Sequence, residues 1–364
     1  MGSRFSCMLS NDKKPSRKNS WKAPKPMKGS SNSSNANRIF KLEEEVLQLC
    51  QQQMRLERSS SMRQPIQASK QGLSRSASAR SRQSNDPIVQ PLQLLKKQEA
   101  ALYAETKNIV LVHGGGFGAW CWYKLVASLE EAGFSVHAID LAGSGIDSTD
   151  PNDISTLELY VKPLITYMEK IPEPEKVMLV GHDFGGACIS YVMERFPQKI
   201  AKSVFVSATM ICNGQSASEV FSPEVVTTDD LLSKSQVFVY KNGNTTPTAM
   251  EFKRDVLKDL LFNQSPAKDV ALACLSIRPM PFAPILEKVS LTPEKYGSIA
   301  RYYIETTDDH ALTAAVQQNM IKLNPPNKVF RLKGSDHSPF LSKPQGLFKI
   351  LLEISQIKSA TQTT

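Results

Sequence analysis

Long apolar runs are missing from this chain of 364 residues. No stretch approaches the roughly 18 consecutive apolar residues of a membrane-spanning helix, which argues against a transmembrane segment. The six cysteines are scattered, and none follows the C-x-x-C spacing of zinc sites or the dense pattern of disulfide frameworks. We therefore expect no metal site, and no sequence signature points to an organic cofactor.

Acidic residues are scarce in the first hundred positions. Residues 1–100 hold 19 Lys and Arg against 7 Asp and Glu, a net charge of +12, whereas the remaining residues hold 25 against 28. The basic character of the chain therefore belongs to its N-terminal part. No helix-turn-helix, zinc-finger or RRM pattern accompanies it, so we expect a targeting signal or a contact with an anionic surface, and no nucleic-acid partner.

Residues 1–100 are predicted to form a disordered basic extension. Residues 1–38 and 57–86 are rich in Ser, Lys and Arg, and they cannot bury enough apolar surface to offset chain entropy. Between them, residues 39–54 are predicted to form a short helix with apolar side chains on one face.

Two functions are open for this extension. Its Ser/Arg-rich, acid-poor composition is typical of an organelle transit peptide, whose partner would be an import machinery. The start M-G-S-R-F-S also fits N-myristoylation at Gly2, with Cys7 as a second acylation site beside the basic tail, which would anchor the protein to an anionic membrane. The two exclude each other on one molecule, and an unmodified extension is the third alternative.

Residues 101–364 are predicted to form a single α/β domain. Strand-like runs at 108–113, 134–140, 177–180, 202–207, 301–306 and 328–332 are interspersed with helical stretches at 119–132, 154–171 and 344–357. This alternation predicts a mostly parallel sheet with helices on both faces. Residues 210–295 interrupt it with helical stretches and prolines, and predict an inserted helical cap above the carboxyl edge of the sheet, where active sites of such folds lie.

The segment 176–186, K-V-M-L-V-G-H-D-F-G-G, is the most informative part of the domain. A short strand enters a tight glycine-bounded turn and leaves it as a helix, which is the nucleophile elbow of the α/β-hydrolase fold with its pattern G-x-S-x-G. Asp183 stands where that pattern has serine. The scaffold is therefore that of a hydrolase, whereas the usual alcohol nucleophile is replaced by a carboxylate.

Three further elements complete the predicted catalytic machinery. The H-G-G-G turn at 113–116 lets backbone N–H groups approach a ligand oxygen, and we assign the oxyanion hole to the N–H groups of Gly115 and Phe184. Asp309, preferred over its neighbour Asp308, and His337 then follow in the chain order nucleophile, acid, histidine. In that scheme the histidine moves protons and the acid orients its ring.

The remaining polar residues near these turns have structural roles in our interpretation. His113 and His182 flank glycines at turns and are predicted to hold those turns in place. Asp140 and Asp147 are predicted to shape the loop after the second strand. No partner is predicted for two further histidines, His137 and His310.

Residues from about 108 to about 357 resemble the plant methylesterase family, relatives of the hydroxynitrile lyases. The matching segments are the elbow, L-V-H-G-G-G-F-G-A-W-C-W-Y-K at 111–124, A-I-D-L-A-G-S-G-I-D at 138–147, L-F-N-Q-S-P at 261–266 and G-S-D-H-S-P-F-L-S-K-P at 334–344. The resemblance implies hydrolysis of methyl esters of small plant hormones or signals, such as indole-acetate, jasmonate or salicylate, with Asp309 and His337 as acid and base. The long extension resembles the chloroplastic subgroup of that family, which implies a chloroplast location; the plasma membrane is the alternative.

Asp183 leaves several mechanisms open. A carboxylate can be a covalent nucleophile, as in epoxide hydrolases, whose elbows read G-H-D-W-G. Against that class, Gly116 replaces the proline of their H-G-x-P loop, and residues 210–295 contain only Tyr240 where such enzymes use paired tyrosines. With an ester, Asp183 could form a mixed anhydride, or activate water together with His337. We expect a carboxylic ester hydrolase, with an epoxide-hydrolase-type enzyme and a non-catalytic binder of small ligands as alternatives.

Overall fold

The structure, a computed structural model, describes residues 103–221, 231–241, 243 and 245–358. The chain divides into two units, residues 1–86 and 87–364, and every described residue belongs to the second. The extension predicted for residues 1–100, with its helix at 39–54, lies outside the described residues. Over the described ranges, no helix combines the length and apolarity needed to cross a membrane.

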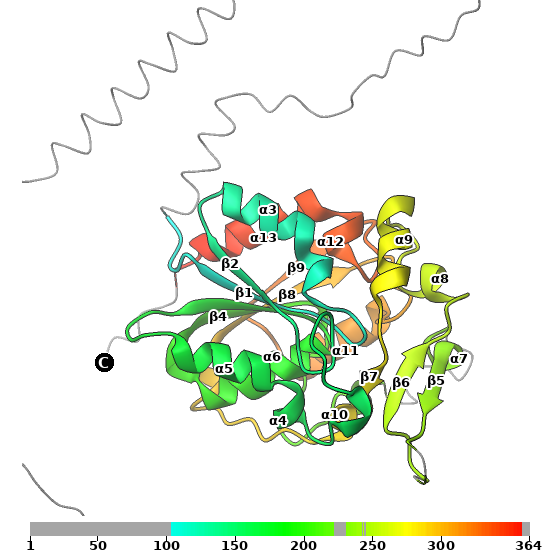
Figure 1. Ribbon diagram of the computed structural model, residues 1–364. Coiled ribbons are helices and arrows are strands. Elements are labelled where there is room, and N and C mark those ends of the chain that lie inside the picture. Colours follow the sequence, from blue (N-terminus) through cyan, green and yellow to red (C-terminus); the bar gives the residue numbers. More distant parts are fainter. Residues whose placement is uncertain (1–102, 222–230, 242, 244, 359–364) are drawn as a thin grey trace, which may run out of the picture. The chain divides into compact units, whose positions relative to one another are not determined.

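A six-stranded sheet forms the centre of the described domain (Figure 1). Its strands stand in the order β2–β1–β3–β4–β8–β9, and each neighbouring pair is parallel. The α/β-hydrolase fold predicted from the sequence is thereby confirmed. The strands are β1 (Asn108–Val112), β2 (Ser135–Ile139), β3 (Val177–Asp183), β4 (Ile200–Ala208), β8 (Ala300–Thr306) and β9 (Lys328–Leu332).

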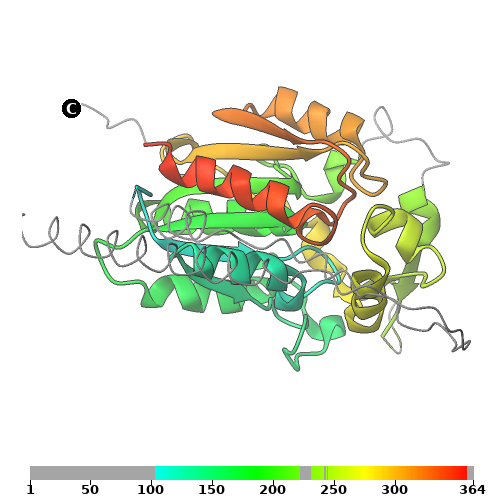
Figure 2. The same cartoon turned by 90° about the horizontal axis from the view of Figure 1, so that it is seen from above.

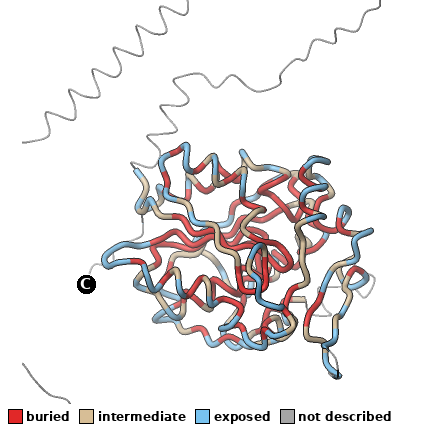
Figure 3. Tube along the Cα trace, in the orientation of Figure 1, coloured by how far each residue is buried: buried red, intermediate tan, exposed pale blue. Residues whose placement is uncertain are grey.

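Helices cover both faces of this sheet, as Figures 1 and 2 show. Successive strand residues point to opposite faces, so that Val110 and Val112 enter one hydrophobic cluster while Ile109 and Leu111 enter the other. The central strands are buried on both faces, whereas the edge strands β2 and β9 are partly exposed (Figure 3). The first cluster includes α5 (Lys162–Lys170), α6 (Gly185–Arg195) and α11 (Ala314–Leu323); the second includes α3 (Tyr123–Glu131), α12 (Pro339–Ser342) and α13 (Pro344–Gln356).

The helix predicted for residues 154–171 is divided in two. Thr156 caps α4 (Leu157–Tyr160) by accepting a hydrogen bond from the N–H of Leu159, and α5 begins anew at Lys162. Pro163 explains the division, because proline lacks an N–H and is tolerated in a helix only within the first turn. Helix α11 was not among the predicted helices. Short 3₁₀ turns are η1 (Ala119–Trp122), η2 (Pro151–Asp153), η3 (Pro197–Lys199), η4 (Ser218–Val220) and η5 (Tyr296–Ser298).

An insertion between β4 and β8 occupies the position predicted for a cap and stands beside the central sheet in Figure 1. Besides helices, it contains a three-stranded antiparallel sheet, β5–β6–β7, which the prediction of a helical cap omitted. Strands of two to four residues are too short to show the alternation that identifies a strand in a sequence. Its elements are α7 (Leu231–Ser235), β5 (Gln236–Val239), β6 (Ala249–Phe252), α8 (Leu257–Leu261), α9 (Ala267–Ser276), β7 (Met280–Pro281) and α10 (Ala283–Leu286).

Lys202 on β4 is fully buried and joins the two ends of the domain. Its Nζ donates to the carbonyl oxygens of Ile354, over 3.2 Å, and of Ile357, both at the C-terminal end of α13. The same Nζ lies 2.9 Å from Oε2 of Glu105, just before β1. A buried ammonium group costs several kcal/mol unless it is paired and hydrogen-bonded, so these partners permit its burial.

Candidate active site

Asp183 occupies the turn between β3 and α6. Its φ of 49° lies in the left-handed region, which only a few per cent of non-glycine residues adopt. A Cβ added at Gly185 would lie 2.5 Å from the carbonyl oxygen of His113, so that glycine allows the elbow to pack against the end of β1. The strained turn presents the Asp183 carboxylate, whose side chain is 22% exposed, above the carboxyl edge of the sheet.

His337 lies between two carboxylates. Its Nδ1 is 3.0 Å from Oδ2 and 3.1 Å from Oδ1 of Asp309, and its Nε2 is 3.8 Å from Oδ1 of Asp183. Asp308 instead accepts a hydrogen bond from the hydroxyl of Thr307. The structure therefore places Asp183, His337 and Asp309 in the spatial order of a nucleophile, a base and an orienting acid.

Asp309 is held by hydrogen bonds from several sides. Its Oδ1 accepts the N–H groups of Ala311 and Leu312 at 2.9 and 2.8 Å, and its Oδ2 accepts the hydroxyls of Thr306, at 2.9 Å, and Ser207. Such an array of donors stabilises the ionised carboxylate and fixes its orientation toward His337.

The two oxyanion-hole donors predicted from the sequence act on the protein's own carboxylate. The N–H of Gly115 donates to Oδ2 of Asp183 over 2.9 Å, and hydrogen bonding by the Phe184 backbone also stabilises the charged form of this group. The close approach requires glycine at position 114, where an added Cβ would lie 2.6 Å from Cβ of Asp183. One oxygen of Asp183 thus sits where a substrate oxyanion would be stabilised.

Asp183, Asp309 and His337 shift one another's pKa values. Burial raises the pKa of Asp183, with His337 and the backbone donors acting in the opposite direction. Burial alone would raise the pKa of Asp309 too, but His337 and the surrounding donors hold it below its ordinary value. For His337, burial is outweighed by the negative charges of Asp309 and Asp183, which raise its pKa to about 9.

The other histidines stand outside this group. The buried His113 ring accepts the N–H of Leu141 at Nε2 and contacts the carbonyl of Gly114 through Nδ1. His182 lies 2.7 Å, through Nε2, from the carbonyl of His337, and so supports the loop that carries it. Burial lowers the pKa of both rings, in keeping with the structural roles predicted for them.

His137 and His310 line neither the group around His337 nor the pocket above it. His137 contacts Ser135 and the ring of Tyr167, whereas Nδ1 of His310 lies 2.7 Å from the carbonyl of Asp259. Asp140 and Asp147 accept backbone N–H groups of Ala119 and Gly143, as expected for residues that shape the loop after β2.

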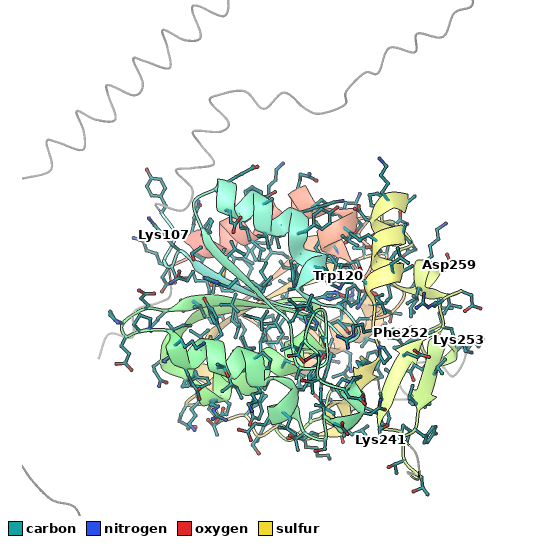
Figure 4. The ribbon with its side chains drawn as sticks, in the orientation of Figure 1. Lys107, Trp120, Lys241, Phe252, Lys253 and Asp259 are labelled. Atoms are coloured by element: carbon teal, nitrogen blue, oxygen red, sulfur yellow. The ribbon has the colours of Figure 1, made fainter. Side chains whose placement is uncertain are left out.

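A pocket of about 320 Å³ opens above Asp183 and His337. The insertion forms much of its wall, including Phe252 on β6, which Figure 4 labels. The described lining is mainly apolar, and its polar side chains besides the two just named are Thr209, Ser218, Ser233 and Gln236. Such a site suits a small and mostly apolar ligand. Within the described ranges, no cluster of three or more His, Cys, Asp or Glu side chains could hold a metal.

Residues 109–350 match the α/β hydrolase family. The chain belongs to this family. Within it, "Putative methylesterase 11, chloroplastic" of Arabidopsis thaliana is 57% identical over 306 residues, which are 84% of this chain and 78% of that protein. "Methyl jasmonate esterase 1" of Vitis vinifera is 38% identical over 252 residues, which are 68% of this chain and 96% of that protein. This α/β hydrolase is therefore a member of the plant methylesterases, as the sequence motifs indicated.

Coverage differs among these relatives. The chain spans 65% of the length of "Putative methylesterase 13, chloroplastic" of Arabidopsis thaliana, to which it is 56% identical. Solved structures agree with the assignment: a methylesterase from Arabidopsis has 32% identity and a TM-score of 0.61, over 68% of this chain and 98% of that one. Polyneuridine aldehyde esterase has 33% identity and a TM-score of 0.64, over 69% of this chain and 100% of that one.

Sequence reasoning missed two residues that support this hydrolase site. Ser207, the residue before the last of β4, has a φ of 42° and donates its hydroxyl to Asp309, although no motif marks it. Asp336 is fully buried and accepts the N–H of Gln264 from the insertion. Gln264 and Asp336 lie in the segments 261–266 and 334–344, which were both recognised as motifs. The sequence does not reveal that these two segments are in contact.

Proposed function

We propose that this α/β hydrolase hydrolyses methyl esters of small carboxylic acids. Its family membership supports ester hydrolysis, and the observation that carries the proposal is the position of His337, held by Asp309 beneath an apolar pocket. An imidazole held in this way can move the protons that ester hydrolysis requires. Asp183 provides the third catalytic group in place of serine, and no metal or organic cofactor enters the chemistry.

The pocket supports a substrate with a compact apolar acyl group. Its described lining carries apolar side chains from both the sheet edge and the insertion, among them Phe117, Leu261 and Met280. Aromatic or aliphatic acids of the size of indole-acetate, jasmonate and salicylate fit this description, and a relative from Vitis vinifera is named for methyl jasmonate. We take the methyl esters of these three acids as the first substrates to test.

The direct test is a panel of these methyl esters, with the free acid detected by mass spectrometry. We expect the full-length protein to release acid from at least one ester, and the variant His337→Ala to lose most of that activity. His310→Ala is the matched control, because its ring lies outside the group around His337. Failure of the full-length protein on every ester, with the fold intact, would contradict the proposal.

We further propose that residues 1–95 direct the protein to chloroplasts. The acid-poor, Ser- and Arg-rich composition supports this, as do the chloroplastic names of several relatives. A fusion of residues 1–95 to a fluorescent reporter should enter plastids by way of the import machinery. A signal at the plasma membrane that disappears with Gly2→Ala would instead show an acyl anchor.

A further inference from the structure

The two oxygens of Asp183 have different surroundings. Oδ2 accepts the N–H of Gly115 at 2.9 Å, whereas Oδ1 faces Nε2 of His337 at 3.8 Å. Oδ2 is therefore engaged and Oδ1 is the oxygen on the side of the proton-transfer group. The carboxylate carbon stands between the oxyanion hole and the histidine.

This arrangement disfavours attack on an ester carbonyl. Such an attack places negative charge on the substrate's carbonyl oxygen, which gains most of its stabilisation from the oxyanion-hole donors. Oδ2 of Asp183 already occupies the Gly115 donor. Attack on a saturated carbon makes no such demand, because the negative charge passes from the attacking carboxylate to the leaving group.

We propose, on the basis of the methylesterase function above, that Asp183 accepts the methyl group of the substrate. Oδ1 attacks the methyl carbon, the bond from that carbon to the ester oxygen breaks, and the acid departs as its carboxylate. The product of this step is a methyl ester of Asp183. The reaction differs from serine-type hydrolysis because the alkyl–oxygen bond, and not the acyl–oxygen bond, is cleaved.

The second step regenerates Asp183. Water loses a proton to His337 and attacks the Asp183 carboxyl carbon, and the resulting oxyanion on Oδ2 is stabilised by the N–H of Gly115, which donates to this oxygen. Collapse of this intermediate breaks the bond to Oδ1, which leaves as methanol with a proton from His337. Ester and water are thus converted to methanol, carboxylate and one proton, with no oxidant or reductant.

The negative charge of Asp183 links the pKa of His337 to the two steps of the proposed reaction. Asp183 is one of the carboxylates that raise the pKa of His337 to about 9. Methylation removes that charge, so the pKa of His337 falls after the first step. The ring therefore loses its proton more readily at the stage when it must activate water.

The side chains of the pocket favour a leaving group that is stable as an anion. Its described lining contains no Tyr, Lys or Arg side chain that could protonate a departing alkoxide, and Tyr240 is 53% exposed on the surface. Leaving groups that are stable as anions need no proton, and carboxylates and halides meet this condition. We therefore expect methyl and other small primary alkyl compounds with an anionic leaving group as the substrate class.

Oxygen labelling tests the proposal. Full-length protein is incubated with an excess of methyl indole-acetate in ¹⁸O-labelled water over many turnovers. Alkyl–oxygen cleavage places the label in methanol and leaves the acid unlabelled. Label in the acid with unlabelled methanol, whether water attacks directly or through an anhydride, overturns the inference but leaves the methylesterase function standing.

A trapping experiment provides the second measurement. With a trideuteromethyl ester, His337→Gln should accumulate a deuterated methyl group on the peptide that contains Asp183, because hydrolysis of the intermediate needs the histidine. Asp183→Asn should carry no such adduct, and His310→Gln should turn over as the unmodified protein does. Ester hydrolysis by the unmodified protein without any adduct in His337→Gln counts against the inference, whereas absence of both hydrolysis and adduct counts against the proposed function as well.

Discussion

The backbone N–H of Gln264 donates a hydrogen bond of 2.9 Å to Asp336, the residue directly before His337. The hydroxyl of Ser265 donates to the same oxygen over 2.7 Å, and the N–H of Ser338 donates to the other oxygen over 3.0 Å. Asp336 is fully buried. A single carboxylate therefore joins the insertion, which forms the pocket wall, to the loop that carries the proposed base.

Replacing this carboxylate should weaken both the fold and the site. Asp336→Ala leaves the buried N–H of Ser338 and two part-buried donors without their acceptor. A buried group left unsatisfied costs about 1–3 kcal/mol, and part-buried groups cost less, so we expect a loss of about 2–4 kcal/mol in the free energy of unfolding. Urea denaturation measures this loss. The exposed Asp255→Ala should change stability by less than about 0.5 kcal/mol, and an equally small effect of Asp336→Ala would refute the proposed role.

Stability should fall at high pH because of His337. Its folded pKa of about 9 is raised above the ordinary value of 6.5, so its contribution is complete below pH 6.5 and is lost as the pH rises through about 9. The difference in unfolding free energy between the unmodified protein and His337→Gln should shrink by up to about 3 kcal/mol over this range. In Asp183→Asn the loss should end at a lower pH and be smaller, since one of the charges that raise the folded pKa of His337 is gone. A difference that does not change with pH would contradict the elevated pKa.

Serine at position 183 should convert the site to acyl–oxygen cleavage. Asp183→Ser removes the carboxylate oxygen from the Gly115 N–H, which becomes accessible to a substrate carbonyl, while His337 and Asp309 are retained. Because a missing member of such a triad costs several powers of ten in rate, we expect methyl ester hydrolysis to increase at least about tenfold. Initial rates of acid release measure the change, and Asp183→Ala should show no gain. Equal or slower hydrolysis by a folded serine variant would mean that the site is adapted to the carboxylate.

The N-terminal extension should be dispensable for folding. The described members of both hydrophobic clusters begin at Ala104, so deletion of residues 1–95 removes none of these described members. We expect the melting temperature to change by only a few degrees, as measured by differential scanning calorimetry. A large decrease, or insoluble protein, would show that the extension packs against the domain.

The positions of the strands along the chain and the elbow could be predicted from the sequence because their signals are local. The run V-M-L-V and the glycines around Asp183 report a buried strand and a turn without reference to distant residues. The same holds for the closing helix, predicted at 344–357 and observed at Pro344–Gln356. The small sheet of the insertion escaped prediction because its strands are stabilised by pairing between residues up to 32 positions apart, such as Ala249 and Pro281, and not by their own pattern.

The hydrogen bonding of Asp183 could not be predicted from the sequence, because it is set by the three-dimensional fold. Gly115, Asp183 and His337 were recognised individually, and their roles were inferred from the chain order of such hydrolases. That the Gly115 N–H donates to the Asp183 carboxylate depends on a contact between residues 68 positions apart, which no local pattern reports. The choice of Asp309 over Asp308 likewise rests on which side chain the turn after β8 directs toward His337.

The buried ammonium group of Lys202 sets the limits of the smallest fragment that can fold alone. Glu105 and the carbonyl of Ile357 are its partners at the two ends of the domain, and they lie close together although they are far apart in the chain. A cut inside either end would remove one of the partners of this desolvated cation, whereas additions outside them would leave its partners in place. The two ends therefore meet at one charge, which makes this region a natural point at which to join them covalently in a circularly permuted chain.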